Sequence, residues 1–191
     1  MSYKQEIQAY MPVNEQEASE KKVILDYIEK FPDNILLREN EFAHLTSSGF
    51  IMNETLDKVL MIHHNIYKTW AWTGGHADGD TDLLYVALKE AKEETGVKTI
   101  KPLMEGIASV DILPVWGHVK KGKYVPTHMH LSVAYILIAD EREALEINPE
   151  ENSGVMWIPV EKLEEYCNEP QIVTIYHKLI DKANSYVKQG N

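Results

Sequence analysis

Three glutamates, Glu90, Glu93 and Glu94, stand close together near the C-terminal end of one predicted helix. At spacings of three and four residues their side chains are neighbours, and like charges placed in this way cost roughly a few tenths of a kcal/mol per pair. Carboxylates are also unfavourable at the negative end of a helix dipole. A divalent cation would reverse both penalties, and carboxylate oxygens suit Mg²⁺ or Mn²⁺. The alternative interpretation is a solvated, charged helix face.

The helix that would position these carboxylates is predicted to run from about Asp82 to Thr95. With about 100° between successive residues, one of its faces can lie on a sheet, and that face carries Leu84, Leu88, Ala91 and Thr95. The Gly74–Gly75 pair predicts a tight turn before the helix, and Gly96 is placed to be its left-handed C-terminal cap. Glycines on both sides favour a loop, helix and loop of fixed shape.

The remaining chain predicts a mixed α/β or α+β domain around this helix. Asn14 can cap an N-terminal helix with Glu17 as its capping-box partner, so we expect residues 1–40 to form a helical extension and residues 41–191 to form the main domain. Patterns typical of strands occupy residues 42–52, 58–64, 103–119, 127–139 and 154–160, the third and fourth as a hairpin. Helical patterns close the chain over residues 160–167 and 171–187.

Residues 75–97 resemble the Nudix box, whose pattern is glycine, five residues, glutamate, seven residues, arginine-glutamate, an aliphatic residue, any residue, glutamate-glutamate, any residue, glycine and an aliphatic residue. The positions that match in register are Gly75, Glu90, Ala91, Glu93, Glu94, Gly96 and Val97. Thr81 stands where the family has its first glutamate, and Lys89 stands where it has arginine. The resemblance implies a Nudix-like α/β/α sandwich with a mixed sheet, preceded by the helical extension.

The resemblance also implies a Mg²⁺-dependent or Mn²⁺-dependent pyrophosphohydrolase. Such an enzyme cleaves a nucleoside diphosphate linked to another moiety, or a related organic pyrophosphate. By match of position, Glu90, Glu93 and Glu94 are candidate metal ligands, and the Gly75 carbonyl is a further one. Glu90 and Glu93 are also candidates for the catalytic base, and Lys89 would orient a glutamate, which we expect to be Glu93. Metal ions would supply an activated water and neutralise the charge that develops on phosphoryl oxygens.

Two departures from the box bear on activity. Thr81 cannot be a charged ligand, and the acids near it that could substitute are Asp78, Asp80 and Asp82. Lys89 keeps the positive charge of the family arginine but lacks its planar, two-pronged donor. Because the other box glutamates are intact, we expect a working metal site with altered occupancy or rate.

Histidines outside the box helix are further candidates. His128 and His130 alternate onto one side of a predicted strand, where they could contact phosphates or transfer protons. Ordinary polar residues at a half-exposed strand end are the alternative interpretation. A histidine-only transition-metal site has no evident third ligand in the sequence. His76, which follows the glycine pair, is interpreted as a hydrogen-bonding residue that shapes a loop.

Two loops add candidates for the substrate and the metal. Many Nudix enzymes carry an additional glutamate before a comparable strand, so Glu151 is a candidate metal ligand or base. The basic cluster at residues 119–126 could reach over an anionic substrate with Lys121, while Trp116 or Tyr124 stacks on a base. The alternative for Glu151 is an ordinary solvated acid in a loop. The alternative for the basic cluster is that its charges keep the hairpin soluble and protect its edge.

The composition limits the partners. A net charge of −11 argues against nonspecific nucleic-acid binding and against docking on anionic membranes. An anionic substrate stays compatible, because a bound divalent metal can invert the local field. The single cysteine, Cys167, and the lack of a signal-like or membrane-spanning apolar segment predict a cytoplasmic protein. Oligomeric state is open, since the terminal helices could pack in a homodimer or simply cap the domain.

Two other functions compete with the pyrophosphohydrolase. An isomerase of isopentenyl-diphosphate type shares the fold but needs a cysteine acid in the cleft, and Cys167 lies in a late predicted helix. A catalytically weak or inactive Nudix-fold sensor that binds a nucleotide is favoured by Thr81 and Lys89. The intact Glu90, Glu93 and Glu94 oppose the sensor.

Overall fold

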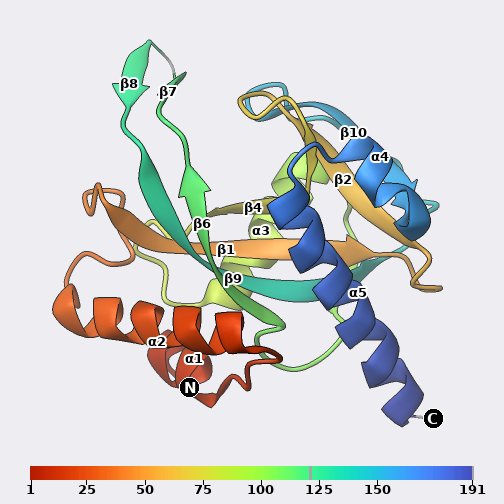
Figure 1. Ribbon diagram of the computed structural model, residues 1–191. Helices are drawn as coiled ribbons and strands as arrows, with labels where there is room; N and C mark the ends of the chain where they lie inside the picture. The colour runs from red at the N-terminus through yellow and green to blue at the C-terminus, as the bar shows by residue number, and fades with distance from the viewer. Residues whose placement is uncertain (121, 191) are drawn as a thin grey trace.

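The computed structural model describes residues 1–120 and 122–190, in which a mixed eight-stranded sheet lies between helices (Figure 1). The main path of the sheet is β10–β2–β1–β9–β5, while β3, β4 and β6 pair with β2, β1 and β9. The strands are β1 (Ala43–Met52), β2 (Lys58–His64), β3 (Trp70–Ala71), β4 (Thr73–His76), β5 (Ile100–Pro102), β6 (Ser109–Val115), β9 (His128–Ala139) and β10 (Asn152–Pro159). A separate hairpin consists of β7 (His118–Lys120) and β8 (Lys123–Val125).

Helices cover both faces of the sheet. They are α1 (Tyr3–Ala9), α2 (Glu15–Lys30), α3 (Leu83–Thr95), α4 (Leu163–Tyr166) and α5 (Pro170–Gly190), with a short 3-10 helix at Val160–Lys162. Ile24 of α2 and Ala87 of α3 belong to one buried cluster, whereas Tyr176 of α5 belongs to the cluster on the opposite face. The order of sequence patterns predicted a domain of this α+β class, and the resemblance to the Nudix family implied the sandwich with a mixed sheet. None of the described helices is long and apolar enough to cross a membrane.

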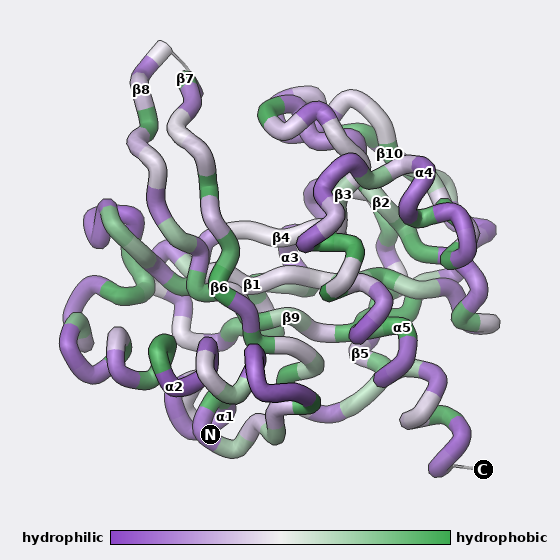
Figure 2. Tube along the Cα trace, in the orientation of Figure 1, coloured by the Kyte–Doolittle hydropathy of each residue, from purple (hydrophilic) through white to green (hydrophobic). Residues whose placement is uncertain are grey.

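A parallel pair of strands, β1 beside β9, forms the centre of the sheet. Every residue of β1 is buried. The predicted alternation of β9 is confirmed, since Leu131 and Val133 face the cluster of α1–α3 while Ala134 faces that of α5. Hydrophobic residues accordingly appear along β2 and β9 in Figure 2, whereas α2 and α5 mix hydrophobic and hydrophilic residues.

The Gly74–Gly75 pair lies in strand β4, so the prediction of a tight turn there was wrong. Gly74 pairs with Ser48 and Gly75 with Ser47, both on β1. A Cβ atom on Gly74 would lie 2.6 Å from the Ser48 Oγ atom. Gly74 is therefore needed for the close approach of β4 to β1. The chain turns later, near Asp78, where φ is 47°.

Helix α3 has the predicted ends. The Asp82 side chain accepts a backbone hydrogen bond from the first turn, and Gly96 ends the helix with a φ of 77°. The buried residues of α3 are Leu83, Val86, Ala87, Ala91, Glu94 and Thr95. The predicted sheet-facing stripe was thus partly wrong: Leu84 and Leu88 are only half-buried, and Glu94 faces inward.

The predicted hairpin of residues 103–119 and 127–139 is present as the antiparallel pair β6–β9. Its first strand begins only at Ser109, later than predicted. Gly106, with a φ of 76°, interrupts the apolar run before that point, because extended backbone has a negative φ. The β7–β8 hairpin extends the far end of this pair away from the sheet (Figure 1).

The N-terminal helices are tied to the last helix through a buried carboxylate. Asn14 caps α2 as predicted by accepting a hydrogen bond from the Glu17 N–H group at 2.8 Å. The Glu17 carboxylate accepts instead from the Val13 N–H and Tyr10 O–H groups, each at 2.8 Å. It also lies 2.8 Å from the Lys178 ammonium of α5. The predicted capping-box partner therefore joins two layers of the fold.

Candidate active site

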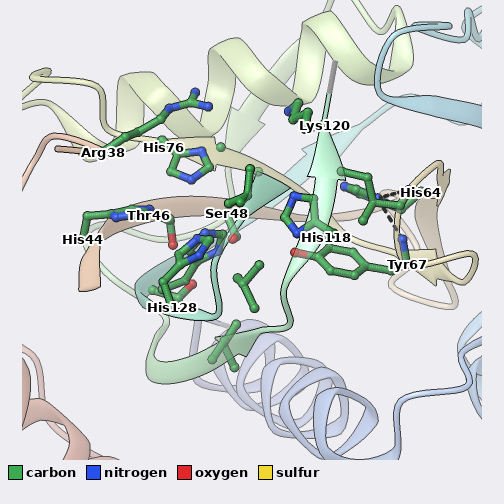
Figure 3. A pocket seen from close by; sticks show the side chains of 18 of the residues that line it. Arg38, His44, Thr46, Ser48, His64, Tyr67, His76, His118, Lys120 and His128 are labelled. Atoms are coloured by element: carbon green, nitrogen blue, oxygen red, sulfur yellow. Dashed lines mark hydrogen bonds between the residues drawn. The ribbon is translucent and has the colours of Figure 1, made fainter. Parts of the chain in front are cut away.

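A pocket of about 430 Å³ lies between β1, β4, β9, helix α3 and the β7–β8 hairpin. Its charged and histidine lining includes Arg38, His44, His64, His76, Glu90, Glu94, His118, Lys120, His128, His130 and Glu151. In Figure 3, His44, His76 and His128 lie together on one side, while Lys120, His118 and Tyr67 lie on the other. The pocket thus places carboxylates, imidazoles and cations around one space.

Three predicted carboxylates, Glu90, Glu94 and Glu151, line this pocket together. Glu94 is buried, and its Oε2 atom accepts a hydrogen bond from the Gly74 N–H group at 3.0 Å. A Cβ atom on Gly75 would lie 2.6 Å from the Glu90 carboxyl carbon. Only glycine at this position lets the β4 backbone come so close to Glu90.

Burial of these carboxylates opposes their ionisation. The pKa of Glu94 is raised to about 8, mainly by burial and in smaller part by the nearby charges of Glu90 and Glu151. The hydrogen bond from Gly74 acts in the opposite direction. Burial likewise raises the pKa of Glu90, and Lys89 partly compensates. The cluster would therefore gain from a positive charge in the pocket.

Glu93 and Lys89 lie at the edge of this arrangement. The Glu93 side chain is 53% exposed, and Glu93 is not among the described residues that line the pocket. The Lys89 ammonium lies 3.5 Å from a Glu90 oxygen and 3.8 Å from a Glu93 oxygen. Lys89 therefore contacts both glutamates, as a residue that orients a carboxylate would.

The acids near Thr81 have other partners. Asp78 forms a two-pronged ion pair with Arg38, with N–O distances of 2.7 and 2.6 Å. The Asp80 and Asp82 side chains accept backbone hydrogen bonds that start α3. Thr81 and these three aspartates are not among the described pocket-lining residues. Glu151, which lies outside α3, lines the pocket together with the box glutamates Glu90 and Glu94.

Histidines from three strands gather on one side of the pocket. The ring centroid of His44 lies 4.8 Å from that of His76 and 5.0 Å from that of His128. The ring centroids of His76 and His130 are 4.8 Å apart. Burial lowers the pKa of His44, and it lowers the pKa of both His76 and His130 to about 2. These rings are therefore neutral near pH 7, which is the form that coordinates metals. His76 ends strand β4 and does not shape a loop as the sequence suggested.

Two cations face the carboxylates. Lys120 of β7 lies 3.5 Å from Glu151, and Arg38 lines the pocket beside its ion pair with Asp78. Lys121, a predicted substrate-binding residue, lies outside the described residues. Trp116 is 69% exposed and is not among the described lining residues, whereas Tyr124 reaches the pocket from β8.

Sequence reasoning missed Arg38 and His44 as pocket residues, and in the predicted basic cluster it named Lys121, whereas Lys120 of that cluster lines the pocket. His44 had a local signal, because His44, Thr46 and Ser48 alternate along β1 and all three line the pocket. The pairing of β1 with β9, which sets His44 beside His130, could not be derived from sequence spacing. Arg38 precedes β1 and had no such pattern.

Cys167 lies away from the pocket. It is buried in the cluster beneath α5 and is not among the described residues that line the pocket. An isomerase chemistry that needs a cysteine acid in the cleft therefore lacks its acid at this site.

The comparisons with known proteins agree with this geometry. A family model described as the NUDIX domain matches residues 43–181. A structure of a Nudix-family hydrolase from Clostridium perfringens is 22% identical, with a TM-score of 0.52, over 72% of this chain and 96% of that chain. The E. coli dihydroneopterin triphosphate pyrophosphohydrolase is 13% identical, with a TM-score of 0.52, over 72% and 92%.

A C. elegans Ap4A hydrolase in a binary complex is 13% identical, with a TM-score of 0.50, over 76% of this chain and 98% of that chain. The comparison with curated protein sequences gave no match. At these identities the solved structures are similar in fold, while the family model covers most of the chain, including every box glutamate. With its box helix, its mixed sheet and this match together, the chain belongs to the Nudix family of hydrolases.

Proposed function

We propose that this protein is a metal-dependent pyrophosphohydrolase that cleaves a nucleoside diphosphate linked to another moiety or a related organic pyrophosphate. The observation that carries the proposal is the meeting of Glu90, Glu94 and Glu151 in one pocket that also presents Arg38 and Lys120. Carboxylates opposite cations in a concave site suit a substrate that is bound through both metal and phosphate.

The residues present fit Mg²⁺ or Mn²⁺. The ion would be held by Glu90, Glu94 and Glu151 together with the Gly75 carbonyl. Gly75 has no Cβ, and a Cβ there would occupy the space beside Glu90. Oxygen donors of this kind are the ones that hard divalent cations prefer. When bound, the ion supplies a water of lowered pKa and positive charge for the phosphoryl oxygens.

The protein's own groups have separable tasks in this proposal. Glu90 and Glu151 are the carboxylates placed to accept a proton from water in the pocket. Lys89 holds Glu90 in place, and Glu93 acts through its contact with Lys89. Lys120 and Arg38 would bind and orient phosphate oxygens through charge-assisted hydrogen bonds.

The substrate class is supported by the names of the similar structures. One is an Ap4A hydrolase and another a dihydroneopterin triphosphate pyrophosphohydrolase. Both names denote compounds with phosphoric anhydride bonds. Tyr124, which is 71% exposed at the rim of the pocket, is placed to stack on a base of such a substrate.

Partners, location and organisation follow as further parts of the proposal. The net charge of −11 supports a small-molecule substrate and opposes nucleic-acid or membrane partners. A cytoplasmic location and a homodimer stay predictions, which fractionation and sedimentation would test. Residues 1–40 are proposed as an extension of the hydrolase domain, because Ile7 and Ile24 pack in the cluster shared with α3.

Activity assays test the proposal. The protein is incubated with Mg²⁺ or Mn²⁺ and a panel of ADP-ribose, nucleotide sugars, dinucleoside polyphosphates and nucleoside triphosphates, and the products are identified. We expect metal-dependent cleavage of an anhydride bond. Glu94→Gln should lower kcat/KM by roughly 10² or more, the scale for losing one group that stabilises the transition state. Glu161→Gln, an exposed glutamate outside the pocket, is the matched control.

The same assay distinguishes the hydrolase from the competing nucleotide-binding sensor. Tight nucleotide binding without turnover under either metal would reject hydrolysis and assign the chain to a nucleotide-binding sensor. Turnover that Glu94→Gln leaves unchanged would reject the assigned site.

A further inference from the structure

The histidine cluster forms a second set of potential ligands in the same pocket. His44 comes from β1, His76 from β4, and His128 and His130 from β9. One ring nitrogen from each lies within 4.8 Å of the others. The parallel register places His44 directly opposite His130 on the neighbouring strand. Four imidazoles separated in sequence therefore converge on one point.

Two of these rings have buried nitrogens that lack a partner. The Nε2 atoms of His44 and His130 are buried and have no hydrogen-bond partner among residues 1–120 and 122–190. A buried polar group left unsatisfied costs about 1–3 kcal/mol. Unpaired ring nitrogens within a cluster of imidazoles indicate that a bound ligand satisfies them.

Backbone carbonyls orient two of the rings. The His44 Nδ1 atom lies 2.9 Å from the Asn40 carbonyl oxygen, and the His128 Nδ1 atom lies 2.9 Å from the Pro126 carbonyl oxygen. Because a carbonyl only accepts, each Nδ1 must carry the proton, and each Nε2 then has a free lone pair. Ligating histidines in metal sites are held in this way by a carbonyl on the other nitrogen.

We propose that His44, His76, His128 and His130 bind one divalent transition-metal ion of the Zn²⁺ type, at a site separate from the box carboxylates. Imidazole suits Zn²⁺ and its neighbours, whereas carboxylate and carbonyl oxygens suit Mg²⁺ and Mn²⁺. In a tetrahedral site with metal–nitrogen bonds of about 2.0–2.1 Å, the nitrogens lie about 3.4 Å apart. The ring nitrogens now lie within 4.8 Å of one another, so metal binding would draw them closer together.

The donor set also determines the charge of the site. Four neutral imidazoles leave the full positive charge of the ion uncompensated, unlike a site built from carboxylates. That charge would face the pocket that Arg38 and Lys120 also line. The ion would join β1, β4 and β9, and it would fix His76 next to Gly75, the residue against which Glu90 packs.

Metal binding can be measured without any hydrolase activity. Untagged protein is stripped with a chelator and titrated with Zn²⁺ by equilibrium dialysis and with Co²⁺ by visible absorption. We expect one Zn²⁺ per chain at the histidine site and the visible bands of Co²⁺ bound by nitrogen ligands. His76→Asn should weaken binding at least tenfold, since even loss of an outer-shell partner costs about 10–100-fold.

Matched variants separate this site from the box. His177→Asn, at an exposed histidine that pairs with Glu164, should bind Zn²⁺ like the wild type. Glu94→Gln should also keep it, even where it abolishes hydrolysis, so the two proposals can fail independently. Circular dichroism confirms that the metal-free variants are folded, and Zn²⁺ should raise the melting temperature of His76→Asn by less than that of wild type and His177→Asn. Absence of stoichiometric binding, or binding that His76→Asn and His130→Asn leave intact, would overturn the proposal.

Discussion

Gly75 lies so close to Glu90 that a side chain at this position would overlap the glutamate. A Cβ on Gly75 would approach three atoms of the Glu90 side chain, the closest at 2.6 Å. Glycine has no side chain, so its backbone can approach a neighbour that any other residue would displace. Gly75, the first residue of the box, must therefore be glycine because a side chain would overlap Glu90. Backbone conformation is not the reason, since its φ is not in the left-handed region.

Gly75→Ala should therefore move the Glu90 carboxylate and impair catalysis. We expect kcat/KM to fall at least tenfold, with a stability loss of about 1–3 kcal/mol, the usual range for overpacking. Steady-state kinetics and urea unfolding measure the two effects. In Gly154→Ala, the new Cβ would meet Trp70 at 3.0 Å outside the pocket lining, so activity should persist. Equal activity of both variants would contradict the assigned position of Glu90.

At the scale of elements, the β7–β8 hairpin brings a cation to the pocket. Lys120 lies on β7, 3.5 Å from Glu151, while Lys123 on β8 is exposed and is not among the described lining residues. Both lysines belong to the same hairpin, but only Lys120 of the two lines the pocket.

Lys120→Ala should raise KM about five- to tenfold with a smaller change in kcat, which corresponds to about 1–1.4 kcal/mol of binding. The reason is loss of a charged contact to phosphate, so KM should also become less sensitive to salt. Kinetics at two ionic strengths measure this effect. Lys123→Ala is the matched control and should behave like the wild type. A large fall in kcat with unchanged KM would assign Lys120 to a different step.

Helices α2 and α5 are joined by a buried charged network. The Lys178 ammonium lies 2.8 Å from Glu17 and 2.7 Å from Asp111. Burial alone would raise the pKa of Glu17, but Lys178 and the hydrogen bonds from Val13 and Tyr10 outweigh it and lower that pKa. The ionised form of Glu17 is therefore the one that stabilises the fold.

Glu17→Gln should lower the free energy of unfolding at pH 7 by about 3–5 kcal/mol, the range for breaking a buried pair. The folded pKa of Glu17 is lowered, so its contribution is fully present above the unfolded value and is lost as the pH falls through the folded pKa. The difference from wild type should thus shrink below about pH 4.5, near the ordinary glutamate pKa. Urea unfolding across pH 3–7 tests this trend, with the exposed Glu15→Gln as control. A difference that grows in acid would contradict it.

At the scale of the whole molecule, the N-terminal helices belong to the packing of the hydrolase domain. Ile7 of α1 and Ile24 and Ile28 of α2 are buried in the cluster that contains Leu131 and Val133 of β9. The family model begins at residue 43, after these helices. Part of the central sheet is therefore covered by a segment outside the matched region.

Deletion of residues 1–40 should expose this apolar surface and destabilise the domain severely. Full burial of each large aliphatic side chain contributes about 1.5–3 kcal/mol, so losing three exceeds what a marginal domain tolerates. Solubility and thermal melting of the deleted chain measure the effect. The triple variant Val13→Ser, Val23→Ser and Met11→Ser, at exposed positions of the same segment, should stay folded. A deleted chain that melts like the full chain would show that the segment is independent.

The sequence alone determined the features that depend on local spacing. Glu90 and Glu94 share a helix that Gly96 terminates, and the period of 3.6 residues per turn decides which of its side chains are neighbours. The alternation that puts His128 and His130 on one face of β9 follows from the two-residue period of a strand. These periodicities are properties of the backbone and need no tertiary information.

Only the tertiary structure decided what meets across strands and loops. The predicted turn at Gly74–Gly75 became a strand because close pairing with β1 overrode the turn preference of glycine. Glu93 is exposed and Glu94 is buried because packing on the sheet selects which face of α3 is covered, and Glu151 reaches the pocket from the loop before β10. The third and fourth histidines of the cluster, His44 and His76, could not be assigned to it from the sequence. They come from neighbouring strands, and strand pairing brings together residues that no spacing along the chain connects.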